Sequence, residues 1–372
     1  MYVWPDLPVN QAIFSPIEVL TDRNSLLDPG DDCPNALSLI PLFKAMSMPA
    51  SVFAKLYYCL PKRYTALTAS HYNQPATFIY GGITQHAEFM GNFCADINGN
   101  GTGAREDNDG EHAMCPLFGA VADTGEQELA EEELPYVRLI AQQLTWDRIG
   151  FGKYRGGMGY DQMVTVRDTQ AWGFMTGQTG SKHPSAYGVF GGYASPAYPL
   201  TKIKNVNIFE GLKDDPELLK LDIVNMMNAQ AIPDADYIAQ GAAMAFEPCA
   251  EGELYMICQG AGGGYGDVLE RDPALVIKDV EDGLMTPALA QEIYFVVFDP
   301  DTLVLDQAAT TAARKAERQA RLGRGKKFDD FCADWVTDEP SPGLPYFGSW
   351  GDDVSEVIAS PPGEARYRMQ GE

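Results

Sequence analysis

Apolar residues recur at helical spacing early in the chain and then give way to a long stretch without that period. Residues 36–46 and 50–60 carry apolar side chains every three or four positions, and Pro61 follows the second pattern, where it cannot extend a helix. From about Ser70 to Gly266 the chain is rich in glycine, aromatic and alternating residues, which favours strands and loops. The pattern predicts two short helices followed by a β-rich core.

Helix signals return after this core. Asp272 has the properties of an N-cap and Pro273 those of a first helical residue, with apolar residues at helical spacing behind them and Gly283 as a stop. Thr286 and Pro287 mark a second helix start of the same kind. We therefore predict two consecutive helices here.

Three further segments complete the prediction. Ile293–Phe298 is an apolar run with β-branched and aromatic residues, typical of a buried strand. Residues 306–323 are rich in Ala, Arg, Lys and Glu, which predicts an exposed helix with intrahelical ion pairs. The tail from Asp338 combines prolines with aromatic rings, so we interpret it as a docking arm over a partner subunit or as a strap over the protein's own core.

The predicted strands and helices are segregated along the chain, which indicates an α+β fold with a β-rich central region and helices at both ends. We divide the chain into residues 1–69, an amino-terminal arm and two short helices; 70–305, a β-rich core with glycine loops and closing helices; and 306–372, a charged helix and docking tail.

Composition narrows the classes of partner. The chain has 372 residues, of which 45% are hydrophobic, enough to bury a sizeable core. Its 52 acidic and 27 basic residues give a formal charge of -25, which disfavours nucleic acid and anionic membranes as partners. We find neither a secretory leader nor an apolar stretch of membrane-spanning length. Seven cysteines without a C-x-x-C pair favour reduced thiols, and we expect a cytoplasmic protein.

The densest glycine run lies at 260–266, where five of seven residues are glycine. Such a run is favoured only where φ is positive or another group approaches the backbone closely. Neither the spacing of a dinucleotide fingerprint nor that of a Walker loop is present in the run. We therefore interpret it as a structural turn that joins a strand to the helix after it, built on Gly262, Gly263, Gly264 and Gly266.

A dense group of ionisable residues occupies positions 105–115. Four carboxylates and one histidine fall within this segment, and such a group can perform acid-base chemistry or bind a metal ion through Asp109, Glu111 and His112. The spacing matches no standard metal motif. The alternative is a solvated acidic loop beside a histidine that is satisfied by its neighbours.

Two other segments carry candidate residues. Gly150–Gly159 is a glycine-rich segment that would present Lys153 and Arg155 at the mouth of the predicted strand Tyr160–Val166, where the two cations could hold a phosphate or carboxylate. The alternative is a β-turn whose cations face the protein's own acidic groups. His183 is either a pocket residue or a simple loop histidine.

Taken in order, several motifs resemble the hydantoinase B family, which includes large subunits of acetone and acetophenone carboxylases. The matching motifs are 152–159 (GKYRGGMG), 188–192 (GVFGG), 262–273 (GGGYGDVLERDP) and 279–283 (DVEDG). The resemblance runs from about Ile13 to Pro300. Family members usually carry a long amino-terminal portion that this chain lacks, which implies that a partner chain completes the fold.

Two segments are more similar to the ketone carboxylase branch of that family than to the hydantoin-opening branch. They are 110–116 (GEHAMCP) and 190–198 (FGGYASPAY). This resemblance implies ATP-dependent, biotin-free carboxylation of a small ketone, in which a carboxyl group derived from bicarbonate joins a ketone enolate. ATP and bicarbonate are expected on partner subunits, among them a hydantoinase A-like chain.

The resemblance also leaves some choices open. A divalent metal ion (Mg, Mn or Zn) would fit such a complex. Lys153 and Arg155 suit an anion, and His112 or His183 could move a proton. The alternatives are a subunit of an ATP-dependent hydantoinase or cyclic amide hydrolase, and a scaffold subunit without catalytic residues.

Overall fold

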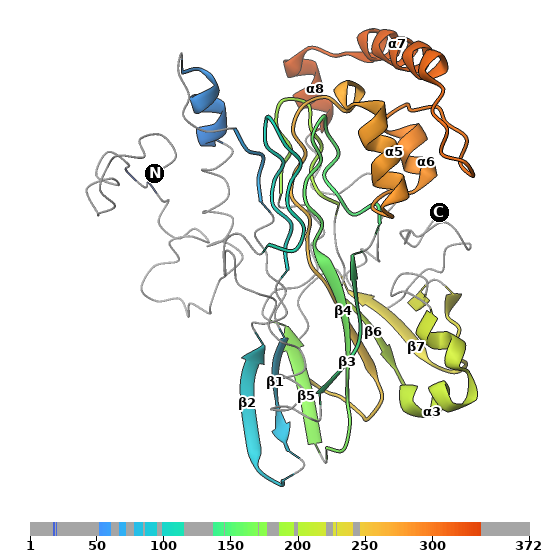
Figure 1. The fold of residues 1–372 in the computed structure, drawn as a ribbon. Coiled ribbons are helices and arrows are strands. Elements are labelled where there is room, and N and C mark those ends of the chain that lie inside the picture. The colour runs from blue at the N-terminus through green and yellow to red at the C-terminus, as the bar shows by residue number, and fades with distance from the viewer. Residues whose placement is uncertain are drawn as a thin grey trace.

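The computed structural model of the chain is shown in Figure 1. Its described residues are 18, 20, 52–60, 67–71, 78–84, 86–94, 99–114, 137–144, 146–169, 171–176, 186–196, 200–220, 226–227, 229–240 and 246–335. The predicted helix at 36–46, the candidate His183 and the tail from Asp338 lie outside them. Residues 52–58 form a helix, as predicted within 50–60.

Two antiparallel sheets form the lower half of the molecule in Figure 1. The four-stranded sheet has the order β2-β1-β5-β8, and its strands are β1 (Phe78–Ile83), β2 (Phe89–Cys94), β5 (Ala171–Thr176) and β8 (Glu247–Pro248). The five-stranded sheet has the order β3-β4-β9-β6-β7, and its strands are β3 (Val137–Leu144), β4 (Tyr160–Val166), β6 (Leu200–Lys204), β7 (Asp236–Gln240) and β9 (Leu254–Cys258).

Strand β4, which was predicted from its sequence, lies inside the five-stranded sheet and is buried along its whole length. On one of its faces Tyr160, Val164 and Val166 pack against Trp172 and Phe174 of the other sheet. Its opposite face contributes to a second core under a helical segment. That segment consists of α3 (Ile208–Asp214) and the 3-10 helix η2 (Pro216–Lys220). Because β4 packs on both faces, alternation of polar and apolar residues is weak in its sequence.

Above the sheets, extended segments run side by side toward the carboxyl-terminal helices (Figure 1). We call them the glycine bundle, comprising residues 69–71, 99–104, 110–113, 149–159, 186–193 and 259–266. Most of its backbone hydrogen bonds run between segments; within segments, Gly156 N donates to Gly150 O and Gly192 N to Val189 O. The bonds between segments recur at every third residue, as when Gly101 N donates to Gly260 O and Ala104 N to Gly263 O. This repeat is that of an extended helix with three residues per turn.

Glycine is required in the bundle because neighbouring backbones occupy the space of a side chain. A Cβ atom on Gly262 would lie 1.8 Å from Thr102 O, and one on Gly156 would lie 1.9 Å from Gly262 O. At Gly263 the Tyr187 carbonyl oxygen is 2.1 Å from the same position. Close approach of backbone to backbone, one of the two reasons expected for the glycine run, is therefore the reason found.

The predicted turn at 260–266 is wrong in its shape. Of its five glycines only Gly266 has a positive φ, 74°, and the run continues β9 as an extended segment bonded to several neighbours. The predicted turn in segment 149–159 is present, because Gly156 N donates to Gly150 O at 2.9 Å across bends at Gly152 and Lys153. Sequence spacing did not distinguish these cases because turns and crowded extended backbone both demand glycine.

Helices follow the bundle at its upper end. They are the 3-10 helix η3 (Val268–Glu270), α5 (Pro273–Glu281), α6 (Pro287–Glu292), α7 (Gln307–Arg324) and α8 (Phe328–Trp335). The predicted caps of α5 and α6 are confirmed, since Asp272 accepts from Ala274 N and Thr286 from Leu289 N. Gly283 has the positive φ, 73°, that suits a residue after a helix.

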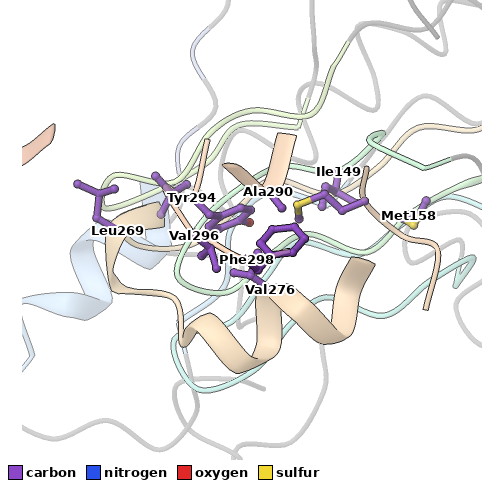
Figure 2. Close-up of a cluster of buried hydrophobic side chains, with 10 residues drawn as sticks. Ile149, Met158, Leu269, Val276, Ala290, Tyr294, Val296 and Phe298 are labelled. Atoms are coloured by element: carbon purple, nitrogen blue, oxygen red, sulfur yellow. The ribbon is translucent and has the colours of Figure 1, made fainter. Parts of the chain in front are cut away.

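The predicted strand at Ile293–Phe298 is wrong, because the run joins neither sheet. Its residues Tyr294, Val296 and Phe298 point into the cluster formed with Val276 of α5 (Figure 2). Ile293 N still donates to Leu289 O, and Val297 N donates to the hydroxyl of a threonine in α7. Alternating burial therefore arises here without a sheet.

Helix α7 agrees with its predicted position and with the expected intrahelical pairs. Glu317 pairs with Arg321 at 2.9 Å. The helix is not exposed all round, because Arg314 reaches inward and donates to the carbonyl oxygens of Tyr294 and Arg271. No helix within the described ranges is long and apolar enough to cross a membrane.

Candidate functional site

A buried network of two arginines and two aspartates joins the glycine bundle to α5. Arg155 comes from the bundle segment 149–159, Asp109 from the loop before segment 110–113, and Asp279 from the inner face of α5. Arg271 lies between η3 and α5. Residues far apart in the sequence thus meet at one place, at the junction of the bundle with the helical cluster.

Arg271 is the centre of this network and is 1% exposed. Its guanidinium donates to both carboxylate oxygens of Asp109, at 2.7 and 2.9 Å, and to Asp279 Oδ2 at 2.7 Å. A further bond runs to Lys153 O at 3.1 Å. Two carboxylates and a carbonyl oxygen therefore use the planar fork of one guanidinium, a geometry that lysine could not supply.

Arg155 completes the network from the opposite side. Its Nε donates to Asp279 Oδ1 at 2.9 Å, and its backbone N–H donates to Asp109 Oδ1 at 2.8 Å. Its side chain is 9% exposed. Arg155 therefore faces the protein's own carboxylates, which was the alternative to an anion-binding role.

The electrostatics of the network keep its charges in place. Burial alone would raise the pKa of Asp109, but the hydrogen bond from Arg271 and the charges of Arg271 and Arg155 outweigh it and lower the pKa. Burial would lower the pKa of Arg271, whereas its bond with Asp109 and the nearby acidic groups raise it. Both partners therefore stay ionised at neutral pH.

His112 lies beside this network, and the bundle holds its ring. Its Nδ1 accepts a hydrogen bond from Met158 N at 2.9 Å. Burial and the charge of Arg155 lower the pKa of His112 to about 4, against the opposing effect of Asp279 and Asp109. The imidazole is consequently neutral at physiological pH.

A second histidine, His71, is held in the same manner. Its Nδ1 accepts a hydrogen bond from Gly103 N at 2.9 Å. Burial and the charge of Arg105 lower its pKa to about 4. Sequence reasoning did not select His71, because it stands alone among polar and aromatic residues without a recognisable motif.

The other sequence candidates are more scattered. The ammonium of Lys153 lies over the ring of Tyr154, 5.6 Å from its centroid. The anion contact of Lys153 stays a prediction. Glu111 is exposed and pairs with Arg105 at 3.5 Å. Gly262, Gly263, Gly264 and Gly266 belong to the bundle that holds His71 and Arg155 in place.

The proposed metal group of Asp109, Glu111 and His112 is not assembled. The carboxylate of Asp109 faces Arg271, Glu111 faces solvent, and His112 Nδ1 faces Met158 N. In the part of the chain that the structure describes, no three His, Cys, Asp or Glu side chains are grouped as metal ligands. Adjacency in sequence was misleading because successive residues of an extended segment point in different directions.

Arg271 and Asp279 were also missed as site residues, although both lie in motifs that carry the family resemblance. A signal was available for Asp279: it stands three positions after Val276 on the apolar face of the helix. An acidic residue on a buried helix face requires a cationic partner, and the preceding arginine is a candidate for that partner.

A separate polar cluster lies in the sheets. Lys202 pairs with Glu247 at 2.6 Å, and Lys204 pairs with Glu253 at 2.6 Å and donates to the Tyr255 hydroxyl at 2.7 Å. These groups satisfy one another across β6, β8 and β9. The cluster therefore stabilises the contact between the two sheets and needs no ligand to balance it.

The chain belongs to the hydantoinase B/oxoprolinase family, whose model matches residues 1–268. It is 30% identical over 359 residues to the acetophenone carboxylase delta subunit of Aromatoleum aromaticum, an alignment that covers 94% of this chain and 51% of that subunit. The acetone carboxylase alpha subunit of Xanthobacter autotrophicus is 29% identical over 66% of this chain and 32% of its own length.

A third relative is named as a subunit of a caprolactamase and not of a carboxylase. The caprolactamase beta subunit of Pseudomonas jessenii is 31% identical over 58% of this chain and 32% of its own length. The chain thus spans between a third and about half of the length of these curated relatives. Family membership confirms the resemblance drawn from the motifs.

Two solved structures share the fold. A nucleotide-free acetone carboxylase structure aligns with a TM-score of 0.64 at 24% identity, covering 72% of this chain and 36% of that chain. The ATP-dependent caprolactamase from Pseudomonas jessenii aligns with a TM-score of 0.52 at 22% identity, covering 70% and 40%. At these identities the alignments establish the common α+β architecture.

Proposed function

We propose that this chain is a subunit of an ATP-dependent, biotin-free ketone carboxylase of the acetophenone or acetone type. The observation that carries the proposal is the 30% identity to the acetophenone carboxylase delta subunit over 94% of this chain. The caprolactamase relative is similar over a shorter part, 58%. The carboxylase alignment therefore accounts for more of the chain.

The proposed reaction joins a carboxyl group derived from bicarbonate to a ketone enolate. Enolate formation places negative charge on the ketone oxygen, and donors that face that oxygen stabilise it. On this chain the bundle histidines offer neutral donors and Lys153 offers a cation for the anionic carboxyl group. Arg155 orients Asp109 and Asp279 and supports the site through them.

Partner subunits supply the remaining parts in this proposal. A hydantoinase A-like chain would hydrolyse ATP in this complex. A divalent metal ion (Mg, Mn or Zn) belongs to the proposed complex; among the described residues of this chain no three possible ligands are grouped.

The similarity to a caprolactamase subunit favours a second candidate, an ATP-dependent cyclic amide hydrolase. Such an enzyme adds water to an amide and has no use for bicarbonate. Both candidates create an oxyanion, so the donors described above serve either reaction. A third candidate is a scaffold subunit that only closes the active site of a neighbour.

The deciding experiment is an assay of the assembled complex. The chain would be co-expressed with its candidate partner subunits, and ATP hydrolysis would be measured with acetophenone or acetone, with and without bicarbonate. We expect ATP hydrolysis and carboxylated product to require bicarbonate. Hydrolysis driven by a lactam or hydantoin without bicarbonate would support the second candidate instead.

The scaffold candidate is tested by Lys153→Ala in the same complex. A catalytic subunit predicts a loss of rate with normal assembly, measured by size-exclusion chromatography. If the rate falls only in proportion to lost assembly, this chain is a scaffold. Arg155→Ala is a less selective test, because it also removes a buried charge that Asp279 needs.

A further inference from the structure

His71 and His112 are fixed by the glycine bundle through the same contact. In each ring Nδ1 accepts a backbone N–H at 2.9 Å, from Gly103 in one case and Met158 in the other. A backbone N–H can only donate, so Nδ1 carries a lone pair and the proton of the neutral ring is at Nε2. The backbone therefore selects the same tautomer in both rings.

The two rings lie beside one part of the bundle. Segment 99–104 bonds to segment 69–71, which carries His71, through Ala69 N and Ala104 O, and to segment 110–113, which carries His112, through Thr102 N and Glu111 O. Both side chains are partly exposed. Within the described residues neither Nε2 has a hydrogen-bond partner, so two N–H donors are left for a ligand at the bundle surface.

This geometry limits the chemistry that the rings can perform. A neutral imidazole with its proton at Nε2 can take up another proton only at Nδ1, where the lone pair already accepts a backbone N–H. Protonation would break that bond and leave the backbone N–H without its partner, at a cost comparable to an unsatisfied buried donor. The rings are thus suited to donate at Nε2 and unsuited to act as bases.

The charged groups around each ring agree with this assignment. Arg155, Asp279 and Asp109 face His112, and Arg105 faces His71. The two aspartates are already paired with Arg271, so they offer limited compensation for an imidazolium. The arginine in each case opposes a second positive charge.

We propose that His71 and His112 donate neutral hydrogen bonds from Nε2 to an oxygen of the substrate that becomes negatively charged, and that neither ring transfers a proton. The nature of that oxygen, a ketone oxygen that becomes an enolate, rests on the proposed function. The tautomers do not, because the backbone contacts alone define them. The proposal replaces the proton transfer that we predicted for His112 from the sequence.

The tautomers can be measured on the full chain without any partner. The chain has four histidines, so selective ¹⁵N-histidine labelling gives four ring systems, assigned with His71→Asn and His112→Asn. We expect the rings of His71 and His112 to remain neutral with Nε2 protonated from pH 8 to pH 5.5. A ring that is protonated at Nδ1, or half-charged near pH 6.5, would overturn the proposal for that residue.

The role of the donors is measured in the assembled complex. His112→Asn can keep an acceptor for Met158 N but lacks the Nε2 donor, whereas His112→Gln can place an amide N–H near the Nε2 position. A donor role predicts that the Gln variant retains at least about tenfold more kcat than the Asn variant, out of a total loss of about 10²-fold or more. His86→Asn, on the exposed turn between β1 and β2, is the matched control.

A base role predicts a different outcome. Both variants would then lose kcat equally, and the wild-type rate would fall on the acid side with a pKa near 6.5. Correct tautomers combined with equal losses would reject the substrate contact alone. Failure of bicarbonate dependence would reject the proposed carboxylase and leave the two tautomers as measured.

Discussion

The antiparallel sheets and the glycine bundle both pair extended backbone, but they fill the space between backbones in opposite ways. Between the sheets, large side chains such as Trp172, Phe174 and Tyr255 occupy that space. In the bundle the neighbouring carbonyl groups occupy it themselves, less than 2 Å from where a Cβ of Gly156 or Gly262 would be. Stability therefore depends on side-chain volume in one region and on its absence in the other.

The difference has a consequence for function. Strands of a sheet direct side chains to two faces, whereas segments with a three-residue repeat direct N–H groups to several neighbours. The bundle thereby gives individual N–H groups, those of Gly103 and Met158, to histidine rings instead of to another strand. The strands of the sheets bond mainly to one another, and their polar cluster is balanced internally.

The largest effect is expected when the same substitution, glycine to alanine, is made in the bundle and in a sheet. Gly262→Ala places a methyl group 1.8 Å from Thr102 O and 2.2 Å from Thr102 C, atoms that cannot move without breaking the bundle. We expect a loss above about 5 kcal/mol, which is exceptional for a single substitution, seen as failure to obtain folded chain by circular dichroism and hydrogen exchange.

Gly91→Ala in β2 is the matched control. Its nearest contact for a methyl group is Tyr80 O at 3.6 Å, an ordinary van der Waals distance. We expect a change within about 1 kcal/mol in the free energy of unfolding. Equal tolerance of both substitutions would show that the bundle backbone is not as close as described.

Sequence alone predicted the segregated α+β arrangement, strand β4 and the caps of α5 and α6. These features depend on local signals, such as Asp272 before Pro273 or Thr286 before Pro287. The family was recognised from motifs rather than from physical reasoning about them. It then defined the site's neighbourhood, because Arg155, Arg271 and Asp279 all lie within those motifs.

The shape of the bundle and the contacts of its charged residues were not predictable in this way. Glycines at 260–266 specify that something is close, and they do not specify that it is Thr102 or Tyr187, some 75 to 160 residues earlier in the chain. Arg155 and Asp279 are paired across 124 positions. Such partners are determined by tertiary topology, which leaves no periodic signal in a single sequence.

The second largest effect concerns the charge network that joins the bundle to α5. Arg271→Met removes the guanidinium from Asp109 and Asp279 and leaves two carboxylates largely buried. We expect destabilisation by about 3–5 kcal/mol, measured as a shift of the urea midpoint. Lys278→Met, which breaks an exposed pair with Asp282 on the same helix, is the control, with an expected loss below about 1 kcal/mol.

Comparable losses in the two variants would mean that the network is hydrated rather than buried. A double variant, Arg271→Met with Asp279→Asn, separates the cost of the unpaired carboxylate from the loss of Arg271 packing. Because part of the cost of Arg271→Met is the carboxylate left behind, neutralising Asp279 is expected to recover some stability. No recovery would indicate that Arg271 acts mainly through packing against the Tyr294 ring.

The glycine bundle and the sheets are also expected to differ, by a smaller amount, in how their stability depends on pH. The pKa values of His71 and His112 are lowered from 6.5 to about 4 in the fold, so between these values the unfolded chain binds more protons than the folded chain. The free energy of unfolding therefore falls as pH decreases from about 6.5 to 4, by about 1–3 kcal/mol for each of the two rings. Asp109, whose pKa is lowered, adds to the loss only below about 4.

The sheets are expected to respond at the other end of the pH scale. Burial and Glu253 raise the pKa of Cys249 from 9.0 to about 12. The contribution of the protonated thiol to the free energy of unfolding is therefore present below pH 9 and is lost as pH rises.

The acid response is measured by hydrogen exchange with mass spectrometry at pH 5 and pH 7.5, corrected for intrinsic rates. Protection should be lost in the bundle segments first. His112→Asn should flatten this acid dependence, and loss that begins in β1 or β5 would contradict the comparison.

The smallest expected effect belongs to a glycine of a third kind. Gly323 lies in α7 with no atom within 4 Å of where its Cβ would be, so neither crowding nor a positive φ requires glycine there. Gly323→Ala should stabilise the chain by at most about 1 kcal/mol, because alanine loses less backbone entropy in a helix. The urea midpoint of the full chain measures this gain. A loss instead of a gain would mean that another surface packs closely on this end of α7, because no described residue occupies the position. Repeating the measurement in the assembled complex would then show whether that surface belongs to a partner or to the chain itself.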